Sequence, residues 1–381
     1  MNGDPDTMKI SVIKTARLAN IPLDLPFHER RTASVDLVWV ETDQGLTGTA
    51  EIGHGPGSAI LRFIEADLTP FLLGRDPLEN ERLMHEMRWR FNPRAEPGVW
   101  NAAVSAIDVA LWDIKGKLYD LPVWRLLGGA QKSVPCYFTF GVRSYGRDAL
   151  VEAARHWVER GHKRLKLMVG RVNVHGEIDM RGASGAHRED DPSEDERRVR
   201  AVREAVGDEV ELMVDAACLL RYDAALRWCK RLEPYNLMWF EEPLLRNDPA
   251  KLAALRRQTS IPIAAGQWED FYGLTGLARA DAVDFLNIQV GSVGGFTMGM
   301  KAAAVAQAFD LPIGNGAYYD MNLHAAVPNG WRTEFHVNDW HMARTLYKDP
   351  PEPEDGWVTL PETPGHGMVL NDDAVREYAR S

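Results

Sequence analysis

The sequence predicts an α/β protein whose middle, roughly residues 133 to 340, is a parallel (β/α) barrel. Two observations support this fold class. Short apolar runs recur along this region, and most of the gaps between them have the pattern of one helix, an alternation that is typical of a parallel sheet. Carboxylates also follow two successive runs, at Asp215 and Glu241, and the strand ends are where such a barrel carries its chemistry.

The first third of the chain is predicted to contain strands followed by helices. Residues 8–51 are strand-like, with alternation over residues 34–41 and a hairpin turn, Thr-Asp-Gln-Gly, over residues 42–45. From residue 58 the pattern becomes helical. It is clearest over residues 100–117, where apolar side chains fall on one face.

Eight apolar runs come next and are predicted as the barrel strands: VPCYFTF, RLKLMV, VELMVD, LMWFEEP, IPIAAG, VDFLNIQV, LPIGNG and RTEFHV. Eight strands that alternate with helices favour a closed barrel over an open sheet. Helices are predicted over residues 223–232, 249–258 and 296–309. A polar insertion over residues 171–196 interrupts the pattern after the second strand, either as a lid or as a disordered loop.

Composition restricts the classes of partner. The chain has 381 residues, enough for two domains, and a net charge of −11 with no Lys/Arg block, so we expect no nucleic-acid partner and no membrane partner. An acidic substrate stays compatible, because cations in a pocket outweigh a diffuse surface charge. The three cysteines form no CxxC pair, and no signal-like or membrane-length apolar run is present. The expected location is cytoplasmic.

The residues at the strand ends predict a metal site. In order along the chain they are Lys166, Asp215, Glu241, Gln267, Gln289, Gly316 and Glu334. The steps from 215 to 241 and from 241 to 267 are both 26 residues, so three oxygen-bearing side chains project from adjacent strands. Oxygen ligands suit Mg²⁺. With such a metal site, Glu242 would orient a ligand or pair with a lysine. The alternative is that the strand-end carboxylates cap helices or pair with arginines.

Several motifs resemble the enolase superfamily, in its mandelate racemase/muconate lactonizing enzyme-like branch. They are Trp-Phe-Glu-Glu-Pro-Leu at 239–244, the helix at 100–117, Leu-Leu-Gly-Gly at 126–129, Val-Gly-Gly at 293–295 and Pro-Gly-His-Gly at 364–367. The resemblance implies a (β/α)7β TIM-like barrel over residues 131–345 beneath an α+β capping domain of residues 1–130. It also implies a C-terminal segment, 346–381, that returns to the cap. Mg²⁺ would stabilise the enediolate that forms when a proton leaves the carbon alpha to a carboxylate.

The sequence departs from that family at the expected acid and base positions. The usual Lys-x-Lys is Lys166-Leu-Met168, so Lys166 matches the lysine that supports the substrate carboxylate and its partner has become a thioether. The third metal ligand, usually Glu, is Gln267, with Glu269 as a possible substitute. The Asp–His dyad falls at Gln289 and Gly316, and Glu334 matches the acid of strand eight that hydrogen-bonds a substrate oxygen.

Replacement acids and bases are therefore needed. The candidates are Lys166 with a lowered pKa, the group Tyr318, Tyr319 and Asp320, and the cap histidines His28 and His54. Each has a plainer interpretation: the tyrosines can simply line a pocket, and the histidines can be solvated loop residues.

The leading functional hypothesis is a Mg²⁺-dependent lyase that acts on a small hydroxy-carboxylate, similar to acid-sugar dehydratases, with Lys166, Tyr318 and Glu334 as catalytic residues. The alternatives are an isomerase of the same superfamily, either an epimerase or a cycloisomerase, and a non-catalytic binding protein that kept the fold. Predicted substrate contacts are Arg30, His54, Trp100, Gln289 and Glu242. Family members are usually dimers or octamers, so we expect a homo-oligomer.

Overall fold

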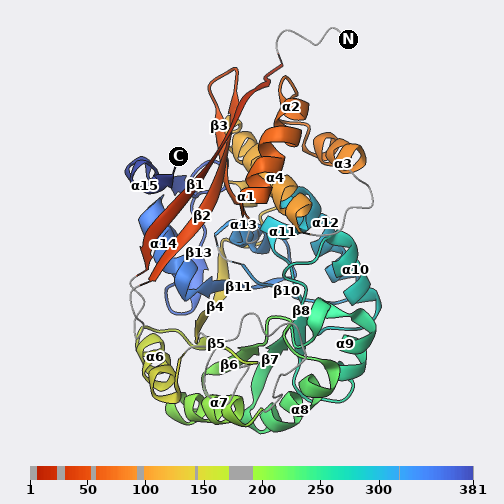
Figure 1. Cartoon of the computed structure of the whole chain (residues 1–381), viewed down its shortest axis with the longest axis vertical. Helices are drawn as coiled ribbons and strands as arrows, with labels where there is room; N and C mark the ends of the chain where they lie inside the picture. The colour runs from red at the N-terminus through yellow and green to blue at the C-terminus, as the bar shows by residue number, and fades with distance from the viewer. Residues whose placement is uncertain are drawn as a thin grey trace.

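A computed structural model describes residues 7–23, 31–52, 57–91, 98–141, 145–170, 192–316 and 318–380 of the chain. Figure 1 shows two layers, an N-terminal unit of sheet and helices above and a barrel below. The predicted fold class, a TIM-like barrel with an α+β capping domain, is confirmed. Within the described ranges, no helix combines the length and the apolar content needed to cross a bilayer.

Eight parallel strands form the barrel, and each overlaps one of the eight predicted apolar runs. They are β4 (Ser133–Gly141), β5 (Arg164–Met168), β6 (Glu211–Asp215), β7 (Leu237–Glu241), β8 (Ile263–Ala265), β9 (Phe285–Asn287), β10 (Ile313–Gly314) and β11 (Gly330–His336). Each strand pairs with the next, and β11 pairs in parallel with β4. That last pairing closes the sheet and leaves the eight strands without a free parallel edge.

Helices surround the barrel because each strand buries its outward apolar side chains beneath one. They are α6 (Arg147–Glu159), α7 (Ser193–Val206), α8 (Tyr222–Leu232), α9 (Pro249–Arg256), α10 (Phe271–Arg279), α11 (Val290–Val293), α12 (Gly295–Ala308), α13 (Tyr319–Ala326) and α14 (Val337–Leu346). Short 3₁₀ turns follow α8 and β7, at Glu233–Tyr235 and Leu245–Asn247.

The interior of the barrel is filled by its own cluster of side chains. Tyr137, Met213, Trp239 and Ala264 are fully buried there, and Trp331 packs against them. The Tyr137 and Trp239 rings meet edge to face, with 5.0 Å between their centroids. This packed layer forms a rigid floor under the strand ends, so polar side chains one layer above it are held in fixed positions.

The cap is an antiparallel sheet packed on helices. Its strands are β1 (Ile10–Leu23), β2 (Arg31–Thr42) and β3 (Thr47–Ile52), and β2 and β3 are joined by the predicted hairpin turn. The helical elements are α1 (Gly57–Phe63), the π-helical turn Ile64–Leu68, α2 (Thr69–Leu72), α3 (Asn80–Phe91), α4 (Val99–Leu118) and α5 (Val123–Leu126).

Helix α4 docks the cap onto the barrel. The Asp108 carboxylate accepts hydrogen bonds from the backbone N–H of Thr297, at 2.9 Å, and from its hydroxyl, at 2.6 Å. A Cβ on Gly295 would lie 2.2 Å from Asp108 Oδ2, so only glycine allows this approach. The motifs at 100–117 and 293–295 are thus two sides of one contact between the domains.

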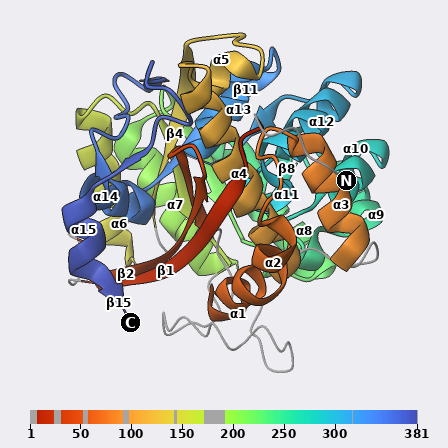
Figure 2. The same ribbon diagram turned by 90° about the horizontal axis from the view of Figure 1, so that it is seen from above.

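The C-terminal segment contacts both domains. It contains β12 (Tyr347–Lys348), β13 (Trp357–Thr359), β14 (Val369–Leu370), α15 (Asp372–Tyr378) and β15 (Ala379–Arg380). Strand β13 pairs antiparallel with β4 of the barrel, and β15 pairs with β1 of the cap. Figure 2 shows α15 and β15 beside β1 at the end of the chain. Between β13 and β14, His366 is buried. Its ring Nε2 donates to the Thr49 carbonyl at 2.9 Å, and its backbone N–H donates to the Asp113 carboxylate at 3.1 Å.

Candidate active site

The barrel rim brings the predicted strand-end residues to one level. Asp215 and Glu241 are the last residues of β6 and β7, and their Cα atoms are direct partners across the two strands. Met168, the last residue of β5, is in turn the partner of Asp215. Side chains of parallel strands that share a register position point the same way. The spacing of 26 residues in the sequence therefore corresponds to adjacent places on the rim.

Three carboxylates converge on one buried ammonium group. Lys166 Nζ lies 2.6 Å from Glu241 Oε2, 3.0 Å from Glu334 Oε1 and 3.5 Å from Asp215 Oδ2. Burial by itself lowers the pKa of Lys166, but the facing carboxylates, Glu241 and Glu334 foremost, raise it well above the ordinary value. The hypothesis that Lys166 is a base with a lowered pKa is therefore wrong for this arrangement. The lysine is a fixed positive charge because three anions surround it.

Some carboxylate oxygens of this cluster accept further hydrogen bonds, and one has no hydrogen-bond partner among the described residues. Glu241 Oε2 also accepts a hydrogen bond from Trp239 Nε1 at 3.1 Å, and Asp215 Oδ1 accepts one from the Ala217 backbone at 2.6 Å. Glu241 Oε1, in contrast, is buried and has no hydrogen-bond partner within the described part of the chain. A buried carboxylate oxygen without a partner is costly unless a ligand completes it.

This donor set fits a hard divalent cation, although it has one carboxylate fewer than a site with three. Asp215 and Glu241 offer carboxylate oxygens at the ends of β6 and β7, and Gln267, which follows β8, offers an amide oxygen and lines the neighbouring cavity. Oxygen ligands of this kind are the ones that Mg²⁺ prefers. Across the described ranges, however, no three His, Cys, Asp or Glu side chains are placed to hold a metal ion. The site has two carboxylates and an amide, so we expect it to bind Mg²⁺ more weakly than a site with three carboxylates.

Glu242 and Glu269 lie behind the rim. Glu242 has a left-handed backbone, with φ of 40°, and its Oε1 accepts a hydrogen bond from Asn247 Nδ2 at 2.9 Å. Burial raises the pKa of Glu269, and a hydrogen bond from the same Asn247 lowers it. Neither glutamate lines the described cavity, which is also true of Asp215 and Glu241, so their contact with Asn247 is what sets them apart. The structure therefore gives no support to Glu269 as a metal ligand or to Glu242 as a substrate contact, and both face the Asn247 side chain instead.

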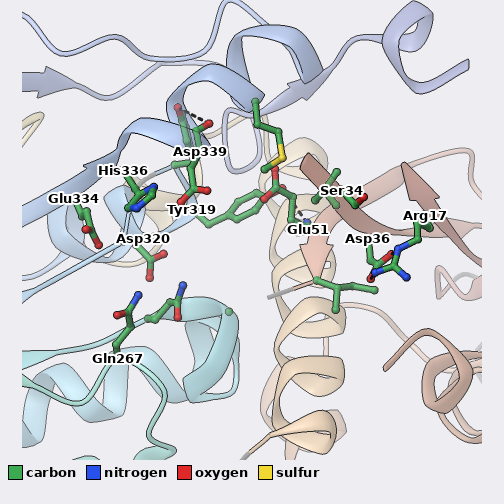
Figure 3. A pocket seen from close by; sticks show the side chains of 17 residues that line it. Arg17, Ser34, Asp36, Glu51, Gln267, Tyr319, Asp320, Glu334, His336 and Asp339 are labelled. Atoms are coloured by element: carbon green, nitrogen blue, oxygen red, sulfur yellow. Dashed lines mark hydrogen bonds and ion pairs between the residues drawn. The ribbon is translucent and has the colours of Figure 1, made fainter. Parts of the chain in front are cut away.

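A cavity of about 240 Å³ lies between the rim and the cap strands (Figure 3). Its barrel side includes Gln267, Gln289, Asp320, Glu334 and His336, and its cap side includes Arg17, Asp36 and Glu51. The amide oxygen of Gln289 is buried and lacks a hydrogen-bond partner among the described residues, so it can accept a hydrogen bond from a bound hydroxyl, in line with its prediction as a substrate contact.

Glu334 and His336 share one face of β11. The Glu334 carboxylate accepts a hydrogen bond from the Thr139 hydroxyl at 2.5 Å. Burial alone would raise its pKa, but Lys166 and His336 lower it below the ordinary value. His336 Nδ1 accepts from the Asn338 backbone at 3.2 Å, which assigns the ring proton of a neutral imidazole to Nε2. The sequence interpretation missed His336, although residues two apart on a strand share a face and Glu334-x-His336 shows that pattern.

The predicted tyrosines form walls of the cavity. The Tyr318 hydroxyl donates to the Asp339 carbonyl at 3.5 Å, and burial raises the pKa of Tyr318 well above its ordinary value. The Tyr319 hydroxyl accepts from the Glu51 backbone at 3.0 Å and lies 3.0 Å from the Tyr347 hydroxyl. Neutral phenols with such contacts position the cap against α13. This arrangement does not support Tyr318 as a base.

The remaining predicted contacts fall elsewhere. Trp100 lies in the first turn of α4 and is half-buried, and its ring centroid lies 5.8 Å from the Arg88 guanidinium. It is not among the residues that line the described cavity, because its ring faces α3 rather than the barrel mouth. Arg30, His28 and His54 lie outside the described residues, so their predicted roles stay predictions.

Two family descriptions span nearly the whole chain. Residues 8–128 match the mandelate racemase / muconate lactonizing enzyme N-terminal domain, and residues 149–374 match the enolase C-terminal domain-like family. The chain belongs to the mandelate racemase and muconate lactonizing enzyme family. The resemblance inferred from the motifs is confirmed.

Members of this family with named activities are similar over most of their length. The 3,6-anhydro-alpha-L-galactonate cycloisomerase of Streptomyces coelicolor is 32% identical over 348 residues, 90% of each chain. Arabinonate dehydratase of Saccharolobus solfataricus is 30% identical over 357 residues, 89% of each chain. The structure of L-talarate dehydratase from Polaromonas sp. JS666, complexed with Mg and L-glucarate, has a TM-score of 0.83 at 29% identity and covers 98% of both chains.

Proposed function

We propose that the protein is a Mg²⁺-dependent lyase that removes water from a small hydroxy-carboxylate, that is, an acid-sugar dehydratase. The observation that carries this proposal is the convergence of Asp215, Glu241 and Lys166 at one point of the barrel rim. The named dehydratases among the relatives support the same reaction class.

The chemistry requires positive charge beside the substrate. A carbon-bound proton alpha to a carboxylate is a very weak acid, and its removal becomes accessible only when the charge that develops on the carboxylate is offset. Asp215, Glu241 and Gln267 would hold Mg²⁺, which supplies part of that charge when bound. Lys166 is a second, fixed positive charge next to it. Gln289 accepts hydrogen bonds and His336 donates one, so together they orient the substrate hydroxyls.

A substrate screen tests the proposal directly. Aldonic and aldaric acids are incubated with the protein and Mg²⁺, and 2-keto-3-deoxy products are measured. We expect one group of stereochemically related acids to be converted, with turnover lost on removal of the metal by a chelator and restored by Mg²⁺. Absence of keto product from every acid would contradict the proposal.

The second candidate function is isomerisation. It is favoured by one observation, the similarity to a cycloisomerase over 90% of the chain. The two reactions differ in mass balance, because a dehydratase product has lost one water and a cycloisomerase product has the mass of its substrate. Mass spectrometry of the same incubations, extended to lactones and anhydro acids, separates them.

A non-catalytic binding role is the third alternative. It rests on the replaced positions Met168, Gln267, Gln289 and Gly316. Calorimetry that shows Mg²⁺-dependent binding of an acid without any chemical change would favour it. The predicted homo-oligomer, a dimer or an octamer, is a separate proposal that light scattering tests.

A further inference from the structure

The end of β10 has no side chain to contribute to the cavity. The rim position there is Gly316, whose backbone is left-handed with φ of +61°. A Cβ added to this residue would lie 2.2 Å from both Cγ and Oδ2 of Asp320. The Asp320 carboxylate therefore occupies the place where a side chain at position 316 would begin. Helix α13 supplies at this point of the rim the functional group that the strand lacks.

Asp320 is buried but lines the cavity. It is 5% exposed, and its Oδ1 accepts a hydrogen bond from the Val290 backbone N–H at 2.5 Å. In Figure 3 the carboxylate points into the cavity, on the side where Gln267 lies. Among the residues that the structure describes, no Lys or Arg forms an ion pair with it. Lys166, the buried cation of the rim, is paired with Asp215, Glu241 and Glu334 instead.

We propose that Asp320 is the general acid that protonates the departing hydroxyl group of the substrate. This inference rests on the dehydration proposed above and names the residue that completes it. In the elimination, the α-proton passes reversibly to a base, which later releases it to solvent, and the electron pair of the Cα–H bond remains in the enediolate. Collapse of the enediolate forms the Cα=Cβ double bond. The Cβ–O bond breaks, and the leaving oxygen takes the Asp320 proton and departs as water. The enol then becomes the 2-keto acid, and Asp320 regains a proton from solvent.

The surroundings keep Asp320 in its acid form. Burial raises its pKa to about 8, although the Val290 N–H lowers it in part and Glu334 adds to the rise. Among the described residues of α11, the group that is hydrogen-bonded to Asp320 is the Val290 backbone N–H. On its own helix, the titratable neighbours Tyr319 and His324 are neutral groups, because burial raises the pKa of the tyrosine well above 10 and lowers that of the histidine to about 4. Their hydrogen-bond partners are Glu51 and Asn315. A carboxylic acid that keeps its proton at neutral pH is suited to protonate a poor leaving group.

A plainer interpretation is that Asp320 only caps α11 through Val290. The two interpretations separate in the variant Asp320→Asn, which keeps an oxygen for the Val290 N–H but has no acidic proton. The experiment uses an acid that the wild-type protein dehydrates and measures keto product and exchange of the substrate α-proton in D₂O. The matched control is Asp310→Asn, an exposed aspartate on the turn after α12.

We expect Asp320→Asn to lose at least about 100-fold in kcat for product, the usual contribution of a general acid. Exchange of the α-proton should stay close to that of wild type, and the variant should remain folded at the pH of the assay. The wild-type kcat should fall as pH rises past about 8, and this limb should be absent from the residual activity of the variant.

Two results would overturn the assignment in distinguishable ways. If wild type forms keto product and Asp320→Asn forms it at the wild-type rate, the acid role of Asp320 is wrong and the lyase proposal stands. If wild type converts no acid at all, the lyase proposal fails and the acid role fails with it. If Asp320→Asn unfolds, Asp320→Glu is measured, and recovery of product there supports a proton-donating carboxyl group.

Discussion

The two halves of the barrel rim hold their functional groups in different ways. On the half formed by β5 to β7, strand residues point directly at one another, and Lys166 lies within 3.5 Å of both Asp215 and Glu241. On the half formed by β8 to β10, the strand ends offer the neutral residues Gln267, Gln289 and Gly316. The ionisable group there, Asp320, comes from the helix after the strand. A barrel can therefore present a functional group at a given place on its rim from either a strand or the helix that follows it.

The largest expected effect comes from removing the charge on the first half. Lys166→Ala leaves three carboxylates without their buried counter-charge, and breaking such a group typically costs about 3–5 kcal/mol. We expect loss of that size in the free energy of unfolding and loss of turnover by at least about 1000-fold. Added Mg²⁺ should recover part of the stability. Urea unfolding with and without Mg²⁺ measures the free energy of unfolding. The control is Lys301→Ala, which breaks an exposed pair with Glu81 and should lower the free energy of unfolding by no more than about 1 kcal/mol. Equal losses in the two variants would contradict a cluster held by Lys166.

The second prediction concerns Asp320, on the other half of the rim, and the pH dependence of the free energy of unfolding. The pKa of Asp320 rises from 3.8 to about 8 on folding, so the folded state binds the proton more tightly. Its contribution to stability is present below pH 4 and is lost as pH rises toward 8, with a slope of at most about 1.4 kcal/mol per pH unit. Asp320→Asn should lack this slope. Chemical unfolding from pH 5 to 8 tests it, and parallel curves for the two proteins would refute it.

The third prediction tests whether Gly316 and Asp320 share one space. Gly316→Ala places a Cβ against the Asp320 carboxylate and strains a left-handed backbone, so we expect a loss of about 1–3 kcal/mol. Keto-product formation should fall with it. In a double-mutant cycle with Asp320→Ala, the cost of the methyl group should shrink, because the competing carboxylate is gone. Strict additivity would show that the two residues do not interact.

The smallest expected effect comes from restoring charge at the metal position. Gln267→Glu adds a third carboxylate beside Asp215 and Glu241, and we expect Mg²⁺ affinity without substrate to rise by about 10-fold, worth roughly 1.4 kcal/mol. Isothermal calorimetry measures it. Glu269→Gln is the control, since that side chain faces Asn247, and its Mg²⁺ affinity should be unchanged. Weaker binding by the control would instead make Glu269 a ligand.

Most of the barrel followed from the sequence because parallel strands buried on both faces leave continuous apolar runs. The carboxylates at the ends of β6 and β7 also followed from the sequence. The spacing of 26 residues between Asp215 and Glu241 is the length of one βα unit, so the two residues occupy equivalent strand ends. His336 could have been found from its alternation with Glu334. The Asp320 carboxylate was one of several candidates, since nothing local indicates which side chain of a helix returns to a strand end.

Protonation states were beyond the sequence altogether. Lys166 with a lowered pKa was one of several candidate bases, because a buried lysine on its own prefers to be neutral. The structure surrounds it with Glu241, Glu334 and Asp215, which reverses the shift. Burial and charge pairing oppose each other at such a site, and which one dominates depends on distances of a few ångströms between residues far apart in the chain.

The sequence by itself determined the family, the order of strands and the carboxylate-bearing half of the rim, because these depend on local periodicity and on residues at strand ends. Tertiary structure alone decided that Lys166 is a counter-charge, that Glu242 and Glu269 face Asn247, and that Asp320 fills the space left by Gly316. The physical reason is that each of these depends on how closely separate βα units approach, and that distance is set by packing across the barrel rather than by neighbours along the chain.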